Sequence, residues 1–556
     1  MAKNQKLKII PLGGLNEIGK NMTAFEFGGD IIVLDCGIAF PDDDMPGIDM
    51  VIPDISYLIK NQSKVRAIVL THGHEDHIGA IPYFLKEINV PIYGSRLTLG
   101  LVEIKLKEHN LLSKTKLHRV RAGDTAKIGA FRVEFIRTNH SIPDAMALAI
   151  HTPIGTIVHT GDFKVDCTPI EGQMIDLAKF GELGKNGVLA LLSESTNVER
   201  PGYTMSESTV GDSFDNIFRN HTDQRIIVAT FASNVHRVQQ IINSAYRFGR
   251  RVAFSGRSME SVAEVAMQLG YMTVPDNVII SIDDIKKYRP NQLVIITTGS
   301  QGETMSALTR MAFSDHKKVE INRGDLVIVS ATPIPGNEKP ISNVINELFK
   351  KGAEVIYKSL ENIHVSGHAC QEELKLILAL TKPKYFIPVH GEFRHLRQHA
   401  LLAEKMGIPS KNIIVGDVGK VIELGPNSCK IGGTVPSGIV LVDGLGVGDV
   451  GNIVLRDRKH LAEDGIIIVV VTMSKNTGAI LSGPDVISRG FVYVRESEDL
   501  MEEAKAIALS SLERSAQRHQ TDWASLKGGL KSSLSDYLYS KTKRKPMILP
   551  IIMEIE

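Results

Sequence analysis

Apolar residues in the first part of the chain come in short runs that are separated by glycine, aspartate and proline. Runs of this length, bounded by turn-forming residues, are typical of β-strands. Helical periodicity is limited to residues 78–88 and 97–109. Many strands with few helices predict a sheet-on-sheet core with helices packed outside it. The predicted strands comprise residues 7–10, 23–27, 30–35, 67–71, 131–137, 147–151, 156–159 and 188–192.

Beyond residue 205, strand-like runs and helix-like periods alternate regularly. Such alternation predicts a parallel, doubly wound sheet with helices on its faces. The strands are expected at residues 225–231, 251–255, 292–298, 325–330 and 354–358, and the helices at residues 235–248, 259–269 and 341–350.

The rest of the chain first returns to mixed elements, with a helix predicted at residues 371–380 and a strand at residues 384–389. The glycine-rich segment 432–451 is typical of a domain rim or linker. A last unit combines strands at residues 466–473 and 547–555 with helices at residues 500–518 and 522–540. We therefore expect a discontinuous α/β domain of residues 1–205 and 356–450, an inserted domain of residues 206–355, and a small α/β domain of residues 451–556.

The composition indicates packed domains, because 43% of residues are hydrophobic and 23% are charged. A formal net charge of +1 provides no general attraction to nucleic acid, so any such affinity must come from local clusters. The four cysteines are far apart and predict neither disulfides nor a zinc knuckle. The sequence has neither a secretory leader nor an apolar run long enough to cross a bilayer, which predicts a cytoplasmic protein without membrane contact.

The strongest chemical signal is the segment His72-Gly73-His74-Glu75-Asp76-His77, at the end of a predicted strand. Three imidazoles and a carboxylate on one turn are rare by chance in a chain with 18 histidines. Imidazole nitrogen and carboxylate oxygen are the ligands of Zn²⁺ in catalytic sites. This turn alone cannot saturate two ions. His140, Asp162 and His390 each follow another predicted strand, where α/β proteins assemble their sites, and they complete a set for two metals.

The segment resembles the signature of the metallo-β-lactamase superfamily, whose fold is an αββα sandwich. The resemblance implies two Zn²⁺ ions per subunit, with Mn²⁺ or Mg²⁺ as alternatives. It assigns His72, His74 and His140 to the first ion and Asp76, His77 and His390 to the second, with Asp162 as the bridging carboxylate. Ions in such a pair ionise a water nucleophile at neutral pH and neutralise charge on phosphate oxygens. The chemistry implied is hydrolysis of a phosphodiester or another hard ester.

The inserted domain resembles the β-CASP insertion of nucleic-acid-processing enzymes, and it is too long to be a loop. The strand end that contains Glu194 resembles the acidic motif of that group, which implies that Glu194 orients a ligand histidine. His368 matches the histidine that serves RNA-cutting members as general acid. The resemblance thus counts Asp76, Glu194 and His368 as catalytic residues. The histidine at position 390 favours RNA over DNA as the substrate.

Over essentially its whole length the chain resembles the bacterial ribonuclease J family. This resemblance implies 5′-to-3′ exonuclease activity combined with endonuclease activity, a preference for 5′-monophosphate RNA, and a role in rRNA processing and mRNA decay. It also implies a homodimer or homotetramer, or an assembly with a paralogue, and contacts with other RNA-decay proteins or the ribosome. All the signature histidines are present, which predicts the active type.

A pocket for a 5′-phosphate needs hydroxyls, imidazoles and free backbone N–H groups, which a strand-to-helix turn supplies. We expect it at Ser233, Asn234 and His236, together with the segment His364-Val365-Ser366-Gly367-His368. The alternative is that Ser233 and Asn234 only cap a helix.

Other features suggest less. His395 and His399 are predicted to lie on a solvated helix face, beside Arg394 and Arg397. Asp49 and Asp443 are candidates for a structural Ca²⁺, as in some relatives. Two other functions stay open at this point, namely a β-CASP nuclease that acts on DNA and a non-catalytic RNA-binding subunit of an RNA-decay complex.

Overall fold

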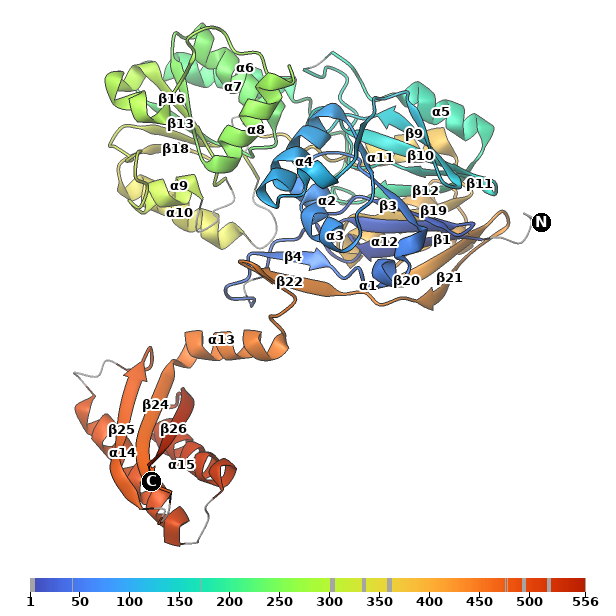
Figure 1. The fold of residues 1–556 in the computed structure, drawn as a ribbon. Helices are drawn as coiled ribbons and strands as arrows, with labels where there is room; N and C mark the ends of the chain where they lie inside the picture. Colours follow the sequence, from blue (N-terminus) through green and yellow to red (C-terminus); the bar gives the residue numbers. More distant parts are fainter. Residues whose placement is uncertain are drawn as a thin grey trace. The chain divides into compact units, whose positions relative to one another are not determined.

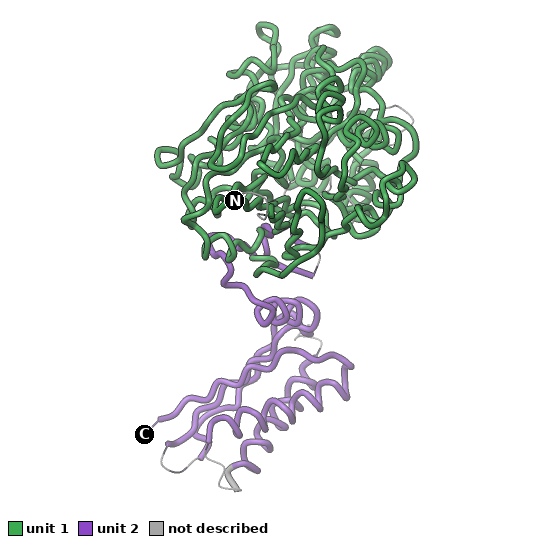
Figure 2. Tube along the Cα trace, turned by 90° about the vertical axis from the view of Figure 1, so that its right-hand side faces the viewer, with its two compact units in different colours: residues 1–39, 52–440 green, residues 40–51, 441–556 purple. Residues whose placement is uncertain are grey.

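The structure of the protein is a computed structural model that describes residues 6–42, 44–170, 172–300, 306–332, 337–357, 363–475, 477, 479–492, 497–517 and 522–555. The backbone contacts group the chain into two compact units, which are coloured separately in Figure 2. Unit 1 comprises Met1–Ala39 and Ile52–Val440, and unit 2 comprises Phe40–Val51 and Leu441–Glu556.

Two sheets face each other in unit 1. The first has eight strands in the order β21 (Ser428–Thr434), β20 (Lys420–Gly425), β1 (Leu7–Gly13), β2 (Met22–Phe27), β3 (Asp30–Leu34), β5 (Val65–Val69), β6 (Ile92–Gly94) and β7 (Leu117–Arg119). The second has six strands in the order β19 (Tyr385–Val389), β12 (Val188–Glu194), β11 (Gly155–His159), β10 (Met146–Thr152), β9 (Phe131–Arg137) and β8 (Thr125–Ile128).

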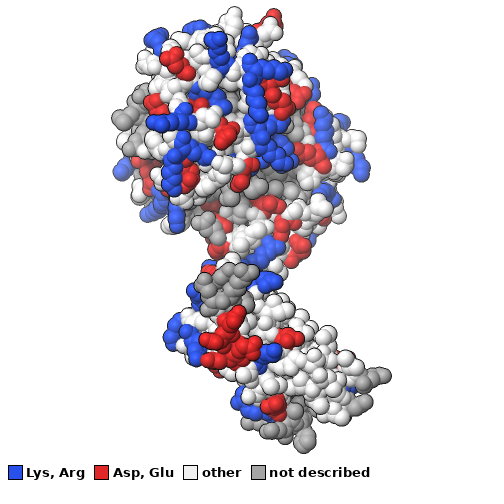
Figure 3. All heavy atoms as spheres, turned by 90° about the vertical axis from the view of Figure 1, so that its left-hand side faces the viewer, with Lys and Arg blue, Asp and Glu red and all other residues white. Residues whose placement is uncertain are grey.

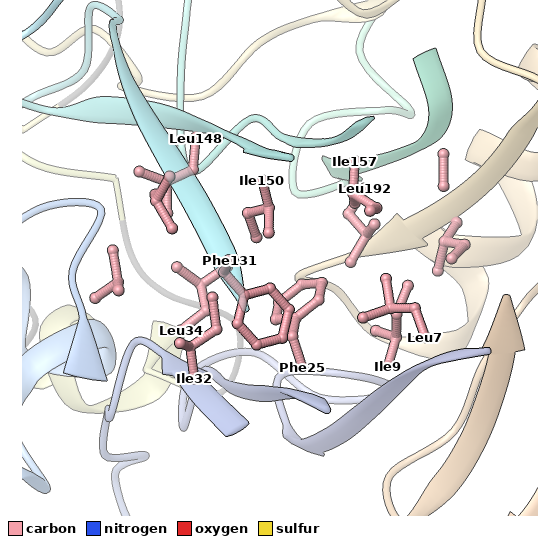
Figure 4. Packing of buried hydrophobic residues seen from close by; sticks show 14 of the residues in the cluster. Leu7, Ile9, Phe25, Ile32, Leu34, Phe131, Leu148, Ile150, Ile157 and Leu192 are labelled. Atoms are coloured by element: carbon pink, nitrogen blue, oxygen red, sulfur yellow. The ribbon is translucent and has the colours of Figure 1, made fainter. Parts of the chain in front are cut away.

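The core of unit 1 lies between these two sheets (Figure 4). Apolar side chains from alternate strand positions point into it, because successive side chains of a strand face opposite sides. Burial of each such side chain contributes about 1.5–3 kcal/mol. The first sheet supplies Leu7, Ile9, Phe25, Ile32 and Leu34, and the second supplies Phe131, Leu148, Ile150, Ile157 and Leu192.

Helices cover the outer faces of this sandwich. α5 (Leu177–Asn186), α11 (Gln371–Thr381) and α12 (Phe393–Lys405) pack on the second sheet through a separate apolar cluster that includes Phe180, Ile377 and Ala403. α1 (Ser56–Lys60), α2 (Glu75–Ile78), α3 (Ile81–Glu87) and α4 (Arg96–Glu108) belong to the N-terminal half. The predicted αββα sandwich is confirmed.

The helix predicted at residues 78–88 is instead two helices, α2 and α3, separated at Gly79 and Ala80. The Ala80 N–H bonds the carbonyl of Cys36, at 2.9 Å, and so leaves the helical pattern.

The inserted domain contains a parallel sheet in the order β15 (Ile279–Ile280), β14 (Arg251–Ser255), β16 (Leu293–Thr297), β13 (Ile226–Ala229), β17 (Leu326–Val329) and β18 (Glu354–Ile356). Figure 1 shows helices on both sides of it. They are α6 (Ser208–Asn220), α7 (Val235–Arg247), α8 (Arg257–Gln268), α9 (Ala307–Ala312) and α10 (Glu338–Lys350). The predicted doubly wound sheet is confirmed, although Lys358 of its last predicted strand lies outside the described residues.

Unit 2 contains the sheet β25 (Ile480–Arg489), β24 (Ile466–Ser474) and β26 (Met547–Ile555), with α14 (Glu498–Gln517) and α15 (Trp523–Thr542) packed on one face. β25 was not predicted, because Gly483-Pro484 and the polar residues of this segment are unusual in a strand. α13 (Asn452–Asp464) was not predicted either, because it has no buried residue and hence no apolar stripe. The predicted glycine-rich linker also forms strands, namely β21, β22 (Ile439–Asp443) and β23 (Gly446–Val447).

Among the described residues, every helix falls short of the length or the apolar character that crossing a bilayer requires.

Candidate metal centre

The signature segment leaves β5 and enters α2, and its side chains face the loops after β9, β11 and β19. Three imidazoles form the first ligand group. His74 Nδ1 lies 3.0 Å from His72 Nε2 and 3.1 Å from His140 Nε2. All three nitrogens can therefore reach a single ion.

Asp76, His77, Asp162 and His390 form the second group, and their ligand atoms lie within 4.8 Å of one another. Asp76 Oδ2 is 3.2 Å from His390 Nε2 and 3.4 Å from His77 Nε2. Asp162 Oδ2 is 3.2 Å from His77 Nε2. The same oxygen is 3.8 Å from His72 Nε2 and 3.9 Å from His140 Nε2, so it faces both groups.

These donors fit a pair of divalent ions. Zn²⁺ takes nitrogen and oxygen ligands at about 2.0–2.1 Å, which places tetrahedral ligand atoms roughly 3.4 Å apart. The distances between the ligand atoms cluster around this value. Burial, reinforced by the neighbouring histidines, lowers the pKa of His72 and His140 well below the usual value. Burial lowers the pKa of His74 to about 4. The three imidazoles are therefore neutral at pH 7, which is the form that coordinates a metal ion.

Residues behind the ligands orient them. Asp35 Oδ2 lies 2.8 Å from His77 Nδ1, and Asp35 Oδ1 accepts from the Thr71 N–H at 2.8 Å. Thr71 Oγ1 in turn lies 3.0 Å from His72 Nδ1. Asp35 was missed as a functional residue, although an aspartate that ends a buried strand was the available signal. Such partners fix the tautomer and orientation of a ligand histidine.

The residues that orient His140 and His390 come from segments that are distant in the chain. The Gly367 carbonyl accepts from His140 Nδ1 at 2.8 Å, and Thr196 Oγ1 lies 2.8 Å from His390 Nδ1. A Cβ on Gly367 would lie 2.7 Å from the His140 ring, so only glycine allows this approach. His390 itself has a positive φ of 53° at the end of β19.

Glu194 is placed differently from the expectation. Its carboxylate contacts His368, with Nδ1 at 3.1 and 3.0 Å from the two oxygens, rather than one of the seven predicted ligands. The Phe163 and Ala369 N–H groups hold the same carboxylate. Burial alone would lower the pKa of His368, but the Glu194 carboxylate and neighbouring aspartates raise it to about 9. The raised pKa keeps the His368 ring protonated at neutral pH, with Nδ1 at 3.9 Å from Asp162 Oδ2.

The residues expected to bind a 5′-phosphate come from two segments, and several of them have structural hydrogen bonds. Asn234 Oδ1 caps α7 by accepting from the Arg237 N–H, as the alternative interpretation predicts. The Val365 carbonyl accepts from the Arg237 side chain, and the Ser366 hydroxyl accepts from Asn197 and from the His368 N–H. Ser233, His236 and His364 are half-buried near this turn. The structure thus brings both predicted segments together around Arg237.

The predicted solvated face of α12 is wrong for its two histidines. His395 is 4% exposed and His399 is 0% exposed. His399 Nδ1 lies 3.0 Å from Ser195 Oγ, and its ring packs against Phe386. Helical spacing located one face of α12, but it could not show that another element covers that face.

The two candidate calcium ligands have other partners. Asp443 pairs with the Arg458 guanidinium, and Asp49 Oδ2 accepts from the Gly444 N–H at 2.7 Å. Within the described ranges, the groupings of potential ligands include neither aspartate.

The surface charge agrees with local rather than global attraction of nucleic acid. On the face drawn in Figure 3, Lys and Arg are interspersed with Asp and Glu, and the formal net charge of the whole chain is +1.

Comparison with protein families gives four matches along the chain. Residues 16–173 match the metallo-beta-lactamase superfamily, and residues 223–348 match the ribonuclease J beta-CASP domain. Residues 352–415 match the Zn-dependent metallo-hydrolase RNA specificity domain, and residues 453–555 match the ribonuclease J C-terminal domain.

The relatives are similar over nearly the full length. The chain is 47% identical to ribonuclease J2 of Bacillus subtilis, covering 99% of each chain. It is 44% identical to ribonuclease J of Thermus thermophilus, covering 99% of this chain and 95% of the relative. A crystal structure of a protein of unknown function from Enterococcus faecalis has the same fold, with a TM-score of 0.54, 20% identity, and 76% and 100% coverage of the two chains. The chain therefore belongs to the ribonuclease J family, and it is a metal-dependent nuclease of RNA processing.

Proposed function

We propose that this nuclease degrades RNA from the 5′ end and also cuts internally, using two zinc ions held by the seven ligands named above. The observation that carries the proposal is the position of Asp162 Oδ2, which faces both ligand groups. A carboxylate in this position would be able to contribute to both ions of an adjacent pair. When bound, such ions supply an ionised water nucleophile and neutralise charge on phosphate oxygens.

His368 completes the reaction as the proton donor. Its Nδ1 faces Glu194, so the proton on Nε2 is the one available to the leaving 3′-oxygen. Glu194 favours the charged imidazolium and fixes the ring orientation. Asp76, Glu194 and His368 are therefore the catalytic set that we propose, with Glu194 acting through His368.

The proposed selectivity for a 5′-monophosphate lies at Ser233, His236 and the 364–368 segment. The N-terminus of α7 lies at this turn, and the dipole of a helix favours an anion at its N-terminus. Replacing both Ser233 and His236 by alanine should reduce the preference for 5′-monophosphate over 5′-hydroxyl RNA. His221→Ala, on the far end of α6, is the control. Unchanged discrimination in the double variant would remove the pocket.

Metal analysis with an end-labelled RNA time course tests the whole proposal. We expect two zinc ions per chain and release of mononucleotides from 5′-monophosphate RNA. Matched RNA and DNA oligonucleotides address the alternative of a DNA nuclease, which predicts faster cleavage of DNA. Binding without cleavage would favour the non-catalytic subunit.

We also propose that the protein is cytoplasmic and forms homo-oligomers. One face of the sheet in unit 2 carries exposed apolar side chains, at Ile487, Leu549, Ile551, Met553 and Ile555. An apolar sheet face of this kind is typical of protein–protein contacts. The occupant proposed is a second copy of this chain, with assembly with a paralogue, an RNA-decay protein or the ribosome as alternatives.

A further inference from the structure

Arg237 is completely buried, at 0% exposed, although it carries a charge. A guanidinium has five N–H donors, and here each has an acceptor. Nε and Nη2 each lie 3.0 Å from one carboxylate oxygen of Glu207. Nη1 donates to the Ser330 carbonyl at 2.9 Å and to His364 Nδ1 at 2.7 Å, and Nη2 also donates to the Val365 carbonyl at 3.2 Å.

These acceptors lie on both connections between the sandwich and the inserted domain. Glu207 is the residue before α6, where the chain leaves the sandwich. His364 and Val365 lie where the chain returns toward α11, and Ser330 follows β17. Ser330 Oγ also donates to the Ile363 carbonyl at 2.5 Å. One side chain therefore joins the outgoing segment, the returning segment and the inserted sheet.

The outgoing segment and the returning segment both connect to the metal centre. The Glu207 N–H donates to Asp166 Oδ2 at 3.0 Å, and Asp166 lies four positions beyond Asp162. Val365 precedes Gly367, whose carbonyl holds His140 at 2.8 Å, and His368 follows directly. A displacement at Arg237 would thus reach a metal ligand, the bridging carboxylate and the proton donor.

The contact also fixes the state of His364. Because a guanidinium only donates, His364 Nδ1 must accept and its proton must be on Nε2. Burial and the adjacent Arg237 charge lower the pKa of His364 to about 2, which agrees with this neutral ring.

We propose that Arg237 is a positioning residue that holds the inserted domain and the 364–368 segment in register with the metal centre. The inference deepens the proposed function and rests on it for the role of His368. A lysine cannot replace Arg237, since an ammonium lacks the planar fork that bonds Glu207 with two N–H groups while reaching the returning segment. A misplacement of about 1 Å at a remote position can cost on the order of 10²-fold in rate.

The test separates positioning from stability. Replacing both partners of a buried ion pair by apolar residues of similar volume often leaves stability unchanged. The variant R237M/E207M leaves no unpaired charge at this position, and its kcat/KM should fall roughly 10²-fold, mainly through kcat. The single variant R237K keeps a charge opposite Glu207, and its kcat/KM should fall roughly 10-fold, again mainly through kcat.

A second buried pair provides the matched control. Arg225 Nε lies 3.1 Å from Asp325 Oδ1, and these residues are 8% and 4% exposed. Both lie within the inserted domain and bond no segment of the sandwich in the described chain. The variant R225M/D325L should keep kcat/KM within about two-fold of wild type.

Circular dichroism and thermal melting establish that each variant is folded, and kcat and KM are measured on 5′-monophosphate and 5′-hydroxyl RNA. The proposal is overturned if folded R237K and R237M/E207M both keep wild-type kcat/KM, or if the control pair loses as much. If the wild-type protein shows no preference for 5′-monophosphate RNA, the proposed phosphate pocket is wrong. The role of Arg237 is still tested in that case, because the loss of kcat in its variants can be measured on 5′-hydroxyl RNA.

Discussion

The Nδ1 atom of His368 lies 3.0 and 3.1 Å from the two carboxylate oxygens of Glu194. These residues are 174 positions apart, and they meet beside Asp162, with His368 Nδ1 at 3.9 Å from Asp162 Oδ2. A carboxylate that contacts an imidazole favours the protonated ring. The pair therefore links the end of β12 to the returning segment, and it supports the proposed role of His368 as general acid.

Replacing His368 by alanine should lower kcat by about 10²–10⁴-fold, because the leaving oxygen loses its proton donor. The metal content should stay close to that of wild type, since His368 is outside the seven ligands. Turnover is followed with end-labelled RNA, and metal content by elemental analysis. A variant that lost its metal ions along with activity would indicate that His368 is itself a ligand.

The variant E194Q should shift the alkaline limb of the kcat profile toward lower pH. The charged acid is the active form, so activity falls as pH rises through the pKa of His368, which is about 9 with Glu194 in place. Without that carboxylate the burial effect dominates and the pKa drops. The control is E134Q, which removes a carboxylate 3.1 Å from His151 Nε2, outside the metal centre. An unshifted limb in E194Q would contradict the assignment of His368.

Replacing Asp35 by asparagine should reduce metal affinity or activity by about 10–100-fold, because His77 loses the partner that orients its ring. Chelator titration followed by an activity assay measures the affinity. Asp124→Asn is the control, since Asp124 only caps an exposed turn by accepting from the Arg121 N–H. Equal effects of both substitutions would show that Asp35 acts through general stability.

The variant G367A should displace His140, because the added Cβ would lie 2.7 Å from its ring. We expect at least a roughly 10-fold loss of activity and weaker binding of one metal ion. The matched control is G433A in β21, where a Cβ would meet nothing within 4 Å. Wild-type metal affinity in G367A would show that the turn adapts without moving the ligand.

The variant G528A should stabilise unit 2 by about 0.5–1 kcal/mol, since Gly528 lies inside α15 and glycine is a poor helix former. A Cβ there meets nothing within 4 Å. Gly202 is equally open but has a φ of +79°, so G202A should destabilise unit 1 instead. Differential scanning calorimetry of the full chain distinguishes the two effects.

Placing lysine at both Leu549 and Ile551 should dissociate the proposed oligomer, because these side chains are 45% and 40% exposed on the open face of the sheet in unit 2. Sedimentation velocity measures the assembly state. Phe313→Lys, at a residue in unit 1 that is 49% exposed, is the control. An unchanged sedimentation coefficient in the double variant would place the contact elsewhere.

The sequence by itself determined the fold class and indicated the proposed ligand set. The short apolar runs bounded by turn residues and the alternation beyond residue 205 reflect which segments contribute to a core, and this information is local. Four of the seven proposed ligands lie within the single turn from His72 to His77, and a contiguous motif needs no tertiary structure to be found. His140, Asp162 and His390 were accessible because strand ends meet at one sheet edge.

Only the tertiary structure decided which side chains support that set. Asp35 behind His77, Glu194 beside His368, and Arg237 between Glu207 and the returning segment are all contacts between segments far apart in the chain. The burial of His399 could not be predicted either, because a helical period shows that a face exists but not what covers it. The physical reason is that a hydrogen bond depends on a distance of about 3 Å in space, which spacing along the chain does not determine.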